Sequence, residues 1–266
     1  MPGTAGKRCV LTIAGSDSGG GAGVQADART IHALGAYALT AVTAVTAQNT
    51  RGIASWRAVS PSLIAAQISA VLADFPVASV KTGLLPGTPA IRAVAAALRR
   101  HRKPPLVVDP VIASTGGTRF LSMTGIRALR RELLARATLV TPNWPEAEAL
   151  SGSRIRTHAD AEEAARRISG ECGCAALVKG GHAGGDSCRD CLSTPDGRVL
   201  WFSSSRVGTR NTHGTGCVLS SAIAAGLAEG LALSDAVEKA RDFLHRALVS
   251  GRGIRWGRGP GPAFAG

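Results

Sequence analysis

The residues Asn-Thr-His-Gly-Thr-Gly-Cys, 211–217, have the composition of an anion-binding turn at the start of a helix. They precede an alanine-rich segment, 218–227, that we expect to be helical. Gly214 and Gly216 allow the backbone to turn sharply, so the unpaired N–H groups of the first helical turn can converge on one anion. Cys217 falls in or near this turn, where the helix dipole favours a thiolate. The arrangement suits phosphoryl transfer to an alcohol, although Gly-Thr-Gly before a helix also occurs in loops without a function.

Other polar side chains lie where predicted strands end. Gln48 offers a donor and an acceptor, as the edge of an aminopyrimidine requires. Asp109 follows a Val-Val strand, and Asn143 and Glu146 are spaced so that both can hold Mg²⁺ through waters. Each of these motifs could instead cap a helix. Lys179 follows another strand and can reach nucleotide phosphates, or it can be an exposed loop charge.

A glycine-rich segment, 14–23, follows the first predicted strand and permits close approach by a ligand or by neighbouring chain. It matches neither the Walker A motif nor the dinucleotide-binding pattern. Asp27 lies on the next predicted helix, on the same inward face as Val24 and Ile31. An acid among core positions is costly unless it is paired, hydrogen-bonded to backbone or functional, so Asp27 is a candidate site residue.

The segments between these motifs alternate between strand-like and helix-like patterns. Strands are expected at 8–14, 37–45, 77–81, 106–108, 138–141 and 175–178, with a hairpin of 188–193 and 198–202. Helices are expected at 24–34, 61–73, 89–100, 125–135, 158–169, 216–229 and 234–248. This order predicts one α/β domain over residues 1–266, with a mostly parallel sheet and helices on both faces. Ligands of such sheets bind beyond the carboxyl ends of the strands, where the polar residues above would gather.

The charge balance is basic, with 31 Lys plus Arg against 18 Asp plus Glu and a formal net charge of +13. The basic residues are dispersed and lack interleaved aromatic residues, so we do not expect a nucleic-acid-binding protein. An anionic substrate or an arginine-rich surface explains the charge equally well. No apolar run reaches membrane-spanning length, and we expect no membrane association.

Six cysteines are present, and we expect a cytoplasmic protein in which they are reduced. Cys172 with Cys174, and Cys188 with Cys191, could in principle hold zinc. We favour free structural thiols, because Cys174 begins one strand-like run and the second pair straddles another.

Taken together and in this order, the motifs resemble the phosphomethylpyrimidine kinases of thiamine biosynthesis, within the ribokinase-like superfamily. The resemblance extends over essentially the whole chain. The matching segments are 12–17, 20–27, 34–37, 47–50, 81–83, 109–111, 141–143, 145–148, 179–182, 211–217 and 257–262.

This resemblance implies a ribokinase-like three-layer α/β/α sandwich and a homodimer. It implies an enzyme that uses ATP and Mg²⁺ to phosphorylate 4-amino-5-hydroxymethyl-2-methylpyrimidine, and then phosphorylates the product to the diphosphate. Substrate would contact Gln48, Asp27, Gly15, Ala22, Leu84 and the backbone at Val111, and the metal would contact Asp109, Asn143 and Glu146. ATP would contact Lys179, Thr212 and His213, while Gly214, Thr215 and Gly216 would form the anion hole beside Cys217 at the catalytic-base position.

The chain departs from the family pattern at two places. Leu84 stands where methionine is usual, and the loop 114–117 lacks a lysine that is often present there. The sequence does not decide whether residues 114–119 close over the site. A pyridoxal kinase of the same superfamily is the alternative enzyme, and Gln48 favours the aminopyrimidine. A non-catalytic nucleotide-binding protein is disfavoured by the intact set of Asp109, Glu146, Lys179 and Cys217.

Overall fold

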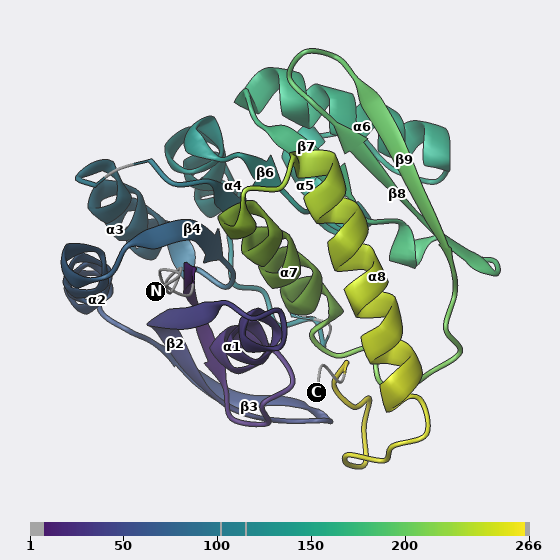
Figure 1. The fold of residues 1–266 in the computed structure, drawn as a ribbon, viewed down its shortest axis with the longest axis horizontal. Helices are drawn as coiled ribbons and strands as arrows, with labels where there is room; N and C mark the ends of the chain where they lie inside the picture. Colours follow the sequence, from purple (N-terminus) through teal and green to yellow (C-terminus); the bar gives the residue numbers. More distant parts are fainter. Residues whose placement is uncertain (1–7, 102, 115, 264–266) are drawn as a thin grey trace, which may run out of the picture.

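The computed structural model describes residues 8–101, 103–114 and 116–263 and contains a nine-stranded sheet (Figure 1). The strands run in the spatial order β3-β2-β1-β4-β5-β6-β7-β8-β9. Their bounds are β1 Cys9–Asp17, β2 Tyr37–Asn49, β3 Gly52–Ala58, β4 Val77–Thr82, β5 Leu106–Val108, β6 Leu139–Val140, β7 Ala175–Val178, β8 Ser187–Ser193 and β9 Val199–Ser205. From β2 to β7 every neighbouring pair is parallel, while β3, β8 and β9 pair antiparallel at the two edges. The predicted mostly parallel sheet and its late hairpin are therefore confirmed.

Helices cover both faces of the sheet, as the α/β/α prediction requires. One layer contains α2 (Pro61–Asp74), α3 (Gly87–Arg99), α4 (Met123–Glu132), α5 (Trp144–Ser151) and α6 (His158–Cys172). The other contains α1 (Gly23–Ala33), α7 (Thr215–Glu229) and α8 (Leu233–Gly251), which lie side by side in front of the sheet in Figure 1. Alternation along β1 separates the two cores, because Leu11 and Ile13 join the first layer and Val10 joins the second. The ribokinase-like three-layer architecture is confirmed.

Helix α7 is buried on nearly all sides, and its small residues make this possible. It contacts β1, β4 and β5 as well as α1 and α8. At Gly226, an added Cβ would lie 3.1 Å from the Cβ of Ala236, so the absence of a side chain lets α7 and α8 approach closely. A helix held this firmly gives its N-terminal turn a fixed position relative to the strand ends.

Two elements were not expected from the sequence. Strand β3 pairs with the extended end of β2, and Trp56 on β3 packs edge-on against Phe120, a contact that only the tertiary fold supplies. Helix α5 begins at the Thr-Pro-Asn-Trp-Pro motif, where Asn143 is the N-cap and Glu146 completes a capping box. The alternative interpretation of this pair as a helix cap is therefore confirmed, and it positions Glu146 beside the strand ends.

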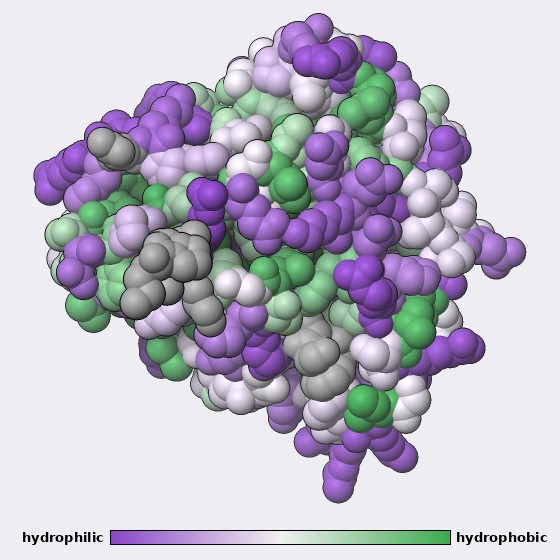
Figure 2. Space-filling model, viewed as in Figure 1, coloured by the Kyte–Doolittle hydropathy of each residue, from purple (hydrophilic) through white to green (hydrophobic). Residues whose placement is uncertain are grey.

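The surface in Figure 2 mixes hydrophilic and hydrophobic residues rather than showing one continuous apolar band. Within the described ranges, none of the helices has both the length and the hydrophobicity that crossing a membrane requires.

Candidate active site

A cavity of about 740 Å³ lies at the carboxyl ends of the parallel strands and reaches between the β8–β9 hairpin and α8. Loops that follow β1, β4, β5, β6 and β7 line it, together with the end of β2 and the first turn of α7. The predicted site residues on its wall are Gly15, Ala22, Gln48, Leu84, Asp109, Val111, Asn143, Glu146, Lys179, Thr212, His213, Gly214, Thr215, Gly216 and Cys217. The fold thus brings together residues from Gly15 to Cys217, towards opposite ends of the chain, as the strand-end argument predicts.

The first turn of α7 forms the centre of this wall. Gly214 is its N-cap, with φ +79°, and a Cβ there would lie 2.0 Å from the carbonyl oxygen of Gly21. Only glycine fits this left-handed position against another backbone. The first intrahelical hydrogen bond runs from Val218 N–H to the Gly214 carbonyl, so the N–H groups of Gly216 and Cys217 precede it. Such a turn offers converging donors to a phosphoryl group.

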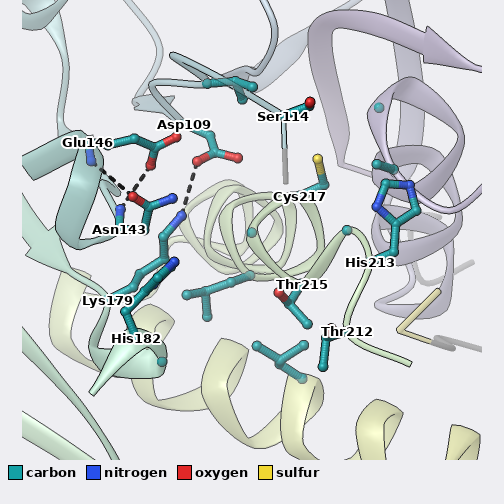
Figure 3. A pocket seen from close by; sticks show the side chains of 18 of the residues that line it. Asp109, Ser114, Asn143, Glu146, Lys179, His182, Thr212, His213, Thr215 and Cys217 are labelled. Carbon is teal, nitrogen blue, oxygen red and sulfur yellow. Dashed lines mark hydrogen bonds and ion pairs between the residues drawn. The ribbon is translucent and has the colours of Figure 1, made fainter. Parts of the chain in front are cut away.

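Lys179 stands beside this turn, opposite two carboxylates (Figure 3). Its Nζ lies 3.2 Å from Asp109 Oδ1 and 3.2 Å from the point where a Cβ of Gly216 would be. Burial alone would lower the pKa of Lys179, but the charges of Asp109 and Glu146 hold it above its usual value. The loops that carry Asn143 and Lys179 are joined by a parallel bridge, which fixes the backbone from which the Lys179 side chain extends.

Glu146 is buried, and its environment disfavours a second negative charge. Its Oε2 accepts a hydrogen bond from Asn143 N–H at 2.9 Å, and Asn143 Oδ1 accepts one from Glu146 N–H at 2.9 Å. Burial and the neighbouring charge of Asp109 raise the pKa of Glu146 to about 7, against the opposing effect of Lys179. A divalent cation next to two carboxylates of this kind would relieve their repulsion.

This raised pKa predicts a pH dependence of stability. Between about 4.5 and about 7, the folded protein retains a proton on Glu146 that the unfolded chain has released. We therefore expect the free energy of unfolding, measured with EDTA and without nucleotide, to fall as the pH rises from about 4.5 to about 7, by up to about 1.4 kcal/mol per pH unit. Glu146→Gln can keep the capping box but has no carboxyl group at this position to titrate, so its free energy of unfolding should fall less steeply with pH than that of the unaltered protein. Equal slopes in urea titrations of the two proteins would contradict the prediction.

Cys217 is half-buried at the start of α7, and its sulfur accepts a hydrogen bond from Gly23 N–H. Burial raises the pKa of the thiol to about 12, and the ammonium of Lys81 offsets only part of this effect. The expectation that the helix dipole favours a thiolate is therefore wrong for the protein without ligands. Desolvation in a crowded turn outweighs a dipole effect of about 1 kcal/mol.

Asp27 does not line the cavity, which corrects its prediction as a residue in direct contact with substrate. Its carboxylate is fully buried and lies 2.8 Å from Lys81 Nζ on β4. It also accepts hydrogen bonds from the hydroxyls of Thr12 on β1 and Ser221 on α7. Asp27 thus ties four elements together behind the first turn of α7. The acid is paired, one of the outcomes that its inward position allowed.

We expect Lys81→Met to lower the free energy of unfolding by about 3–5 kcal/mol, because it leaves the charge of Asp27 buried without a partner. The double variant Lys81→Met, Asp27→Asn should recover part of this loss. Lys239→Met, which breaks a solvent-exposed pair with Glu229, is the control and should change stability by less than about 1 kcal/mol. Urea unfolding measures all three, and a loss below about 1 kcal/mol in Lys81→Met would contradict the prediction.

His213 lies on the other side of the α7 turn from Lys179. It was predicted to contact ATP together with Lys179, but Figure 3 places these residues on opposite sides of the α7 turn. The Nε2 atom of His213 lies 2.9 Å from Asp17 Oδ2 and 3.1 Å from the carboxamide of Gln48. The ring therefore belongs with the predicted substrate-reading residue.

Sequence reasoning assigned no role to Asp17, Lys81, Asp190 or Arg241. Asp190 and Arg241 form an ion pair on the cavity wall, and Asp190 Oδ1 accepts a hydrogen bond from Gly180 N–H at 2.7 Å, next to Lys179. A signal existed only for Lys81, a lysine within a strand that is otherwise uncharged. The other partners are far apart in sequence, and only the fold reveals their pairing.

The four cysteines considered as zinc ligands form no disulfide, and Cys172, Cys174 and Cys191 are buried while Cys188 is half-buried. In the part of the chain that the structure describes, three or more His, Cys, Asp or Glu side chains nowhere gather as metal ligands would. Asp109 and Glu146 place two carboxylates on the same wall of the cavity. Such a site suits Mg²⁺ that takes its other ligands from water and nucleotide phosphates.

Comparisons with known proteins agree with this geometry. A family model described as phosphomethylpyrimidine kinase matches residues 17–263. A hydroxymethylpyrimidine/phosphomethylpyrimidine kinase of Rhizobium meliloti is 45% identical over 95% of this chain and 94% of its own length. A thiamine biosynthesis bifunctional protein of Geobacter sulfurreducens is also 45% identical, and the chain spans 51% of that longer protein.

Two solved structures have the same fold over most of the chain. An ADP complex of Bacillus subtilis pyridoxal kinase has a TM-score of 0.87 and 31% identity, covering 97% of this chain and 98% of the other. A phosphomethylpyrimidine kinase of Clostridium difficile 630 has a TM-score of 0.79 and 35% identity, covering 91% and 100%. The neighbour with the higher identity of these two is the pyrimidine kinase.

Proposed function

We propose that this chain, which belongs to the phosphomethylpyrimidine kinase family, transfers the terminal phosphoryl group of ATP to 4-amino-5-hydroxymethyl-2-methylpyrimidine and then to its monophosphate. One observation carries the proposal. The first turn of α7 lies in a single cavity between Lys179 on one side and His213 on the other, and the His213 ring contacts the carboxamide of Gln48. A phosphate-binding end and a heterocycle-binding end therefore face the same anion hole.

At the phosphate end, Lys179 would neutralise charge on the ATP phosphates, and the N–H groups of Gly216 and Cys217 would receive the transferring group. The part of the cavity between the β8–β9 hairpin and α8 offers room for the rest of the nucleotide. Asp109 and Glu146, with Asn143 as the cap that positions Glu146, would hold Mg²⁺ or its waters. The metal would supply charge neutralisation between the phosphates.

At the other end, Gly15, Ala22, Leu84 and Val111 would enclose the pyrimidine ring while Gln48 binds its amino edge. A Cβ at Gly15 would lie 2.8 Å from Cδ2 of Leu84, so these two residues pack directly against each other and form one continuous part of the wall. The hydroxymethyl group would then point at the α7 turn, and Cys217 would sit beside the attacking oxygen.

Mass spectrometry of products formed from ATP, Mg²⁺ and the hydroxymethylpyrimidine tests the proposal directly. Mono- and diphosphate should appear in succession. A protein that phosphorylates pyridoxal with a higher kcat/KM than the pyrimidine would favour the alternative, pyridoxal kinase. The likeness to the Bacillus subtilis structure makes this comparison of substrates necessary. If the protein turned over ATP with neither alcohol, both kinase functions would be refuted.

The same proposal includes a cytoplasmic enzyme that acts as a homodimer. Light scattering of the purified protein tests the dimer, and a mass of one 27.1 kDa chain would overturn it.

A further inference from the structure

A cluster of three side chains at the heterocycle end of the cavity has a hydrogen-bond pattern with a single consistent solution. Asp17 ends β1, Gln48 lies near the end of β2, and His213 precedes the α7 turn. His213 Nε2 contacts both Asp17 Oδ2 and the carboxamide of Gln48, at 2.9 and 3.1 Å. One ring nitrogen thus joins an acid to the residue that is proposed to bind the pyrimidine.

Asp17 is an ionised carboxylate that only accepts hydrogen bonds. Its Oδ1 accepts from Gly19 N–H at 2.8 Å, and its Oδ2 accepts from Gly21 N–H at 3.0 Å and Ala22 N–H at 2.9 Å. Burial alone would raise the pKa of Asp17, but the hydrogen bonds from His213 and from backbone N–H groups outweigh burial and lower it. The nitrogen that faces Oδ2 must therefore carry a hydrogen, so His213 is protonated at Nε2.

This proton decides which way the Gln48 carboxamide faces. The structure places the amide nitrogen of Gln48 at this point, 3.1 Å from His213 Nε2, but because Nε2–H is itself a donor, that order sets two donors against each other. The amide oxygen fits instead and accepts from the same N–H. The oxygen and nitrogen of an amide have nearly the same size, so the network, not the shape, decides their order.

Thr46 supports the same orientation from the other side. Its Oγ1 lies 3.0 Å from the carbonyl oxygen of Ser16 and 3.3 Å from the Gln48 atom that the structure places as the amide oxygen. A hydroxyl has one hydrogen, and the shorter contact assigns it to the Ser16 carbonyl. Thr46 Oγ1 then accepts from the amide NH₂ of Gln48, and every donor in the cluster has an acceptor.

The histidine ring has little freedom to leave this position. Its backbone N–H donates to the Gly261 carbonyl at 3.0 Å, and its carbonyl accepts from Ala263 N–H at 2.9 Å. A Cβ at Gly21 would lie 2.3 Å from Cδ2 of the ring, so the β1–α1 loop packs tightly against it. The C-terminal segment and this loop hold the ring from two sides.

We propose that Asp17 and His213 are positioning residues that lock the Gln48 carboxamide in one order and so determine specificity for the heterocycle. The amide oxygen lies on the His213 side and the amide nitrogen on the Thr46 side. A ligand must present a donor to the first and an acceptor to the second, as an amino group beside an unprotonated ring nitrogen does. The corresponding pyrimidin-4-one, with a carbonyl beside a ring N–H, presents the reverse order and is rejected. The identity of the ligand in this inference rests on the proposed function, whereas the orientation of the amide rests only on the hydrogen-bond network.

The orientation is tested on the protein alone by NMR of ¹⁵N-labelled histidine in the full chain. The His213 signals are identified among the six histidines by their loss in His213→Phe. We expect a ring protonated at Nε2, and a ring protonated only at Nδ1 would overturn the proposal even if the enzyme proves to be a kinase. This measurement needs no turnover, so its outcome is separate from that of the proposed function.

The specificity is tested by the ratio of kcat/KM for the aminopyrimidine to kcat/KM for the pyrimidin-4-one. We expect a ratio of at least about 100 in the unaltered protein, as for sites that leave buried polar groups unpaired by the wrong ligand. In His213→Phe the amide can turn, and the ratio should fall at least tenfold. The matched control is His182→Phe, which alters a histidine on the Lys179 side of the same cavity and should leave the ratio unchanged. An equal loss for both pyrimidines in His213→Phe, with an unchanged ratio, would overturn the proposal.

Discussion

Lys179→Met is expected to lower kcat by about 100- to 1,000-fold, the usual effect of removing one group that stabilises transition-state charge. The ammonium lies beside the first turn of α7 and is paired with Asp109 at 3.2 Å. In the transition state for phosphoryl transfer, negative charge spreads over the oxygens of the moving group. Methionine keeps the length of the side chain but removes the charge. The KM for ATP should rise less than kcat falls, because the lost contact matters most in the transition state.

Initial rates with the hydroxymethylpyrimidine over a range of ATP concentrations measure this effect. Lys179→Met also leaves Asp109 without its ion-pair partner, so the Tm of each variant must be recorded to exclude unfolding. Lys239→Met is the matched control, because it removes a lysine from α8 at an exposed pair with Glu229. A fall in kcat of less than about tenfold would show that Lys179 has no direct part in phosphoryl transfer.

Most of the site can be predicted from the sequence because its polar residues come near the carboxyl ends of predicted strands. Asp109 and Lys179 come directly after short buried strands and Asn143 follows two residues beyond the loop start after another, and parallel strands bring their carboxyl ends to one edge. Glycine at positions 214 and 216 is enough to predict the turn before α7. Where periodicity and turn residues agree, as at β5 and β7, the expected and observed bounds coincide.

The parts that the sequence could not supply depend on distant partners. The sequence pattern places Asp27 on the inward face of a helix. Its ion pair with Lys81, however, depends on the register of β1 against β4. The thiol of Cys217 was expected to ionise from its place on a helix, whereas its burial depends on how α7 packs. His213 is 165 positions from Gln48, and its contact arises only when the β2 end and the α7 turn meet. Local patterns predict elements and candidate residues, but protonation and pairing are properties of the packed structure.

The last prediction concerns Cys217, which we propose receives the proton of the attacking alcohol. Its pKa of about 12 means that the thiolate is a small fraction near neutral pH, yet a strong base when it forms. In a loose transition state the proton leaves late, so base strength contributes less than position. The second phosphorylation differs, because its acceptor is a phosphate oxygen that is already ionised.

Cys217→Ala should therefore slow phosphorylation of the alcohol by about 100-fold or more, within the range of general-base effects. Phosphorylation of the monophosphate should fall by less than about tenfold, because no proton has to be removed. The two steps are assayed separately by mass spectrometry, each from its own purified substrate. In the unaltered protein, the first step should also accelerate between pH 7 and 9, as the thiolate fraction grows below a pKa of about 12, while the second should not. Cys217→Ser, which keeps a polar atom of similar size, separates loss of the base from loss of packing. Equal losses in the two steps of Cys217→Ala would mean that Cys217 shapes the anion hole and transfers no proton.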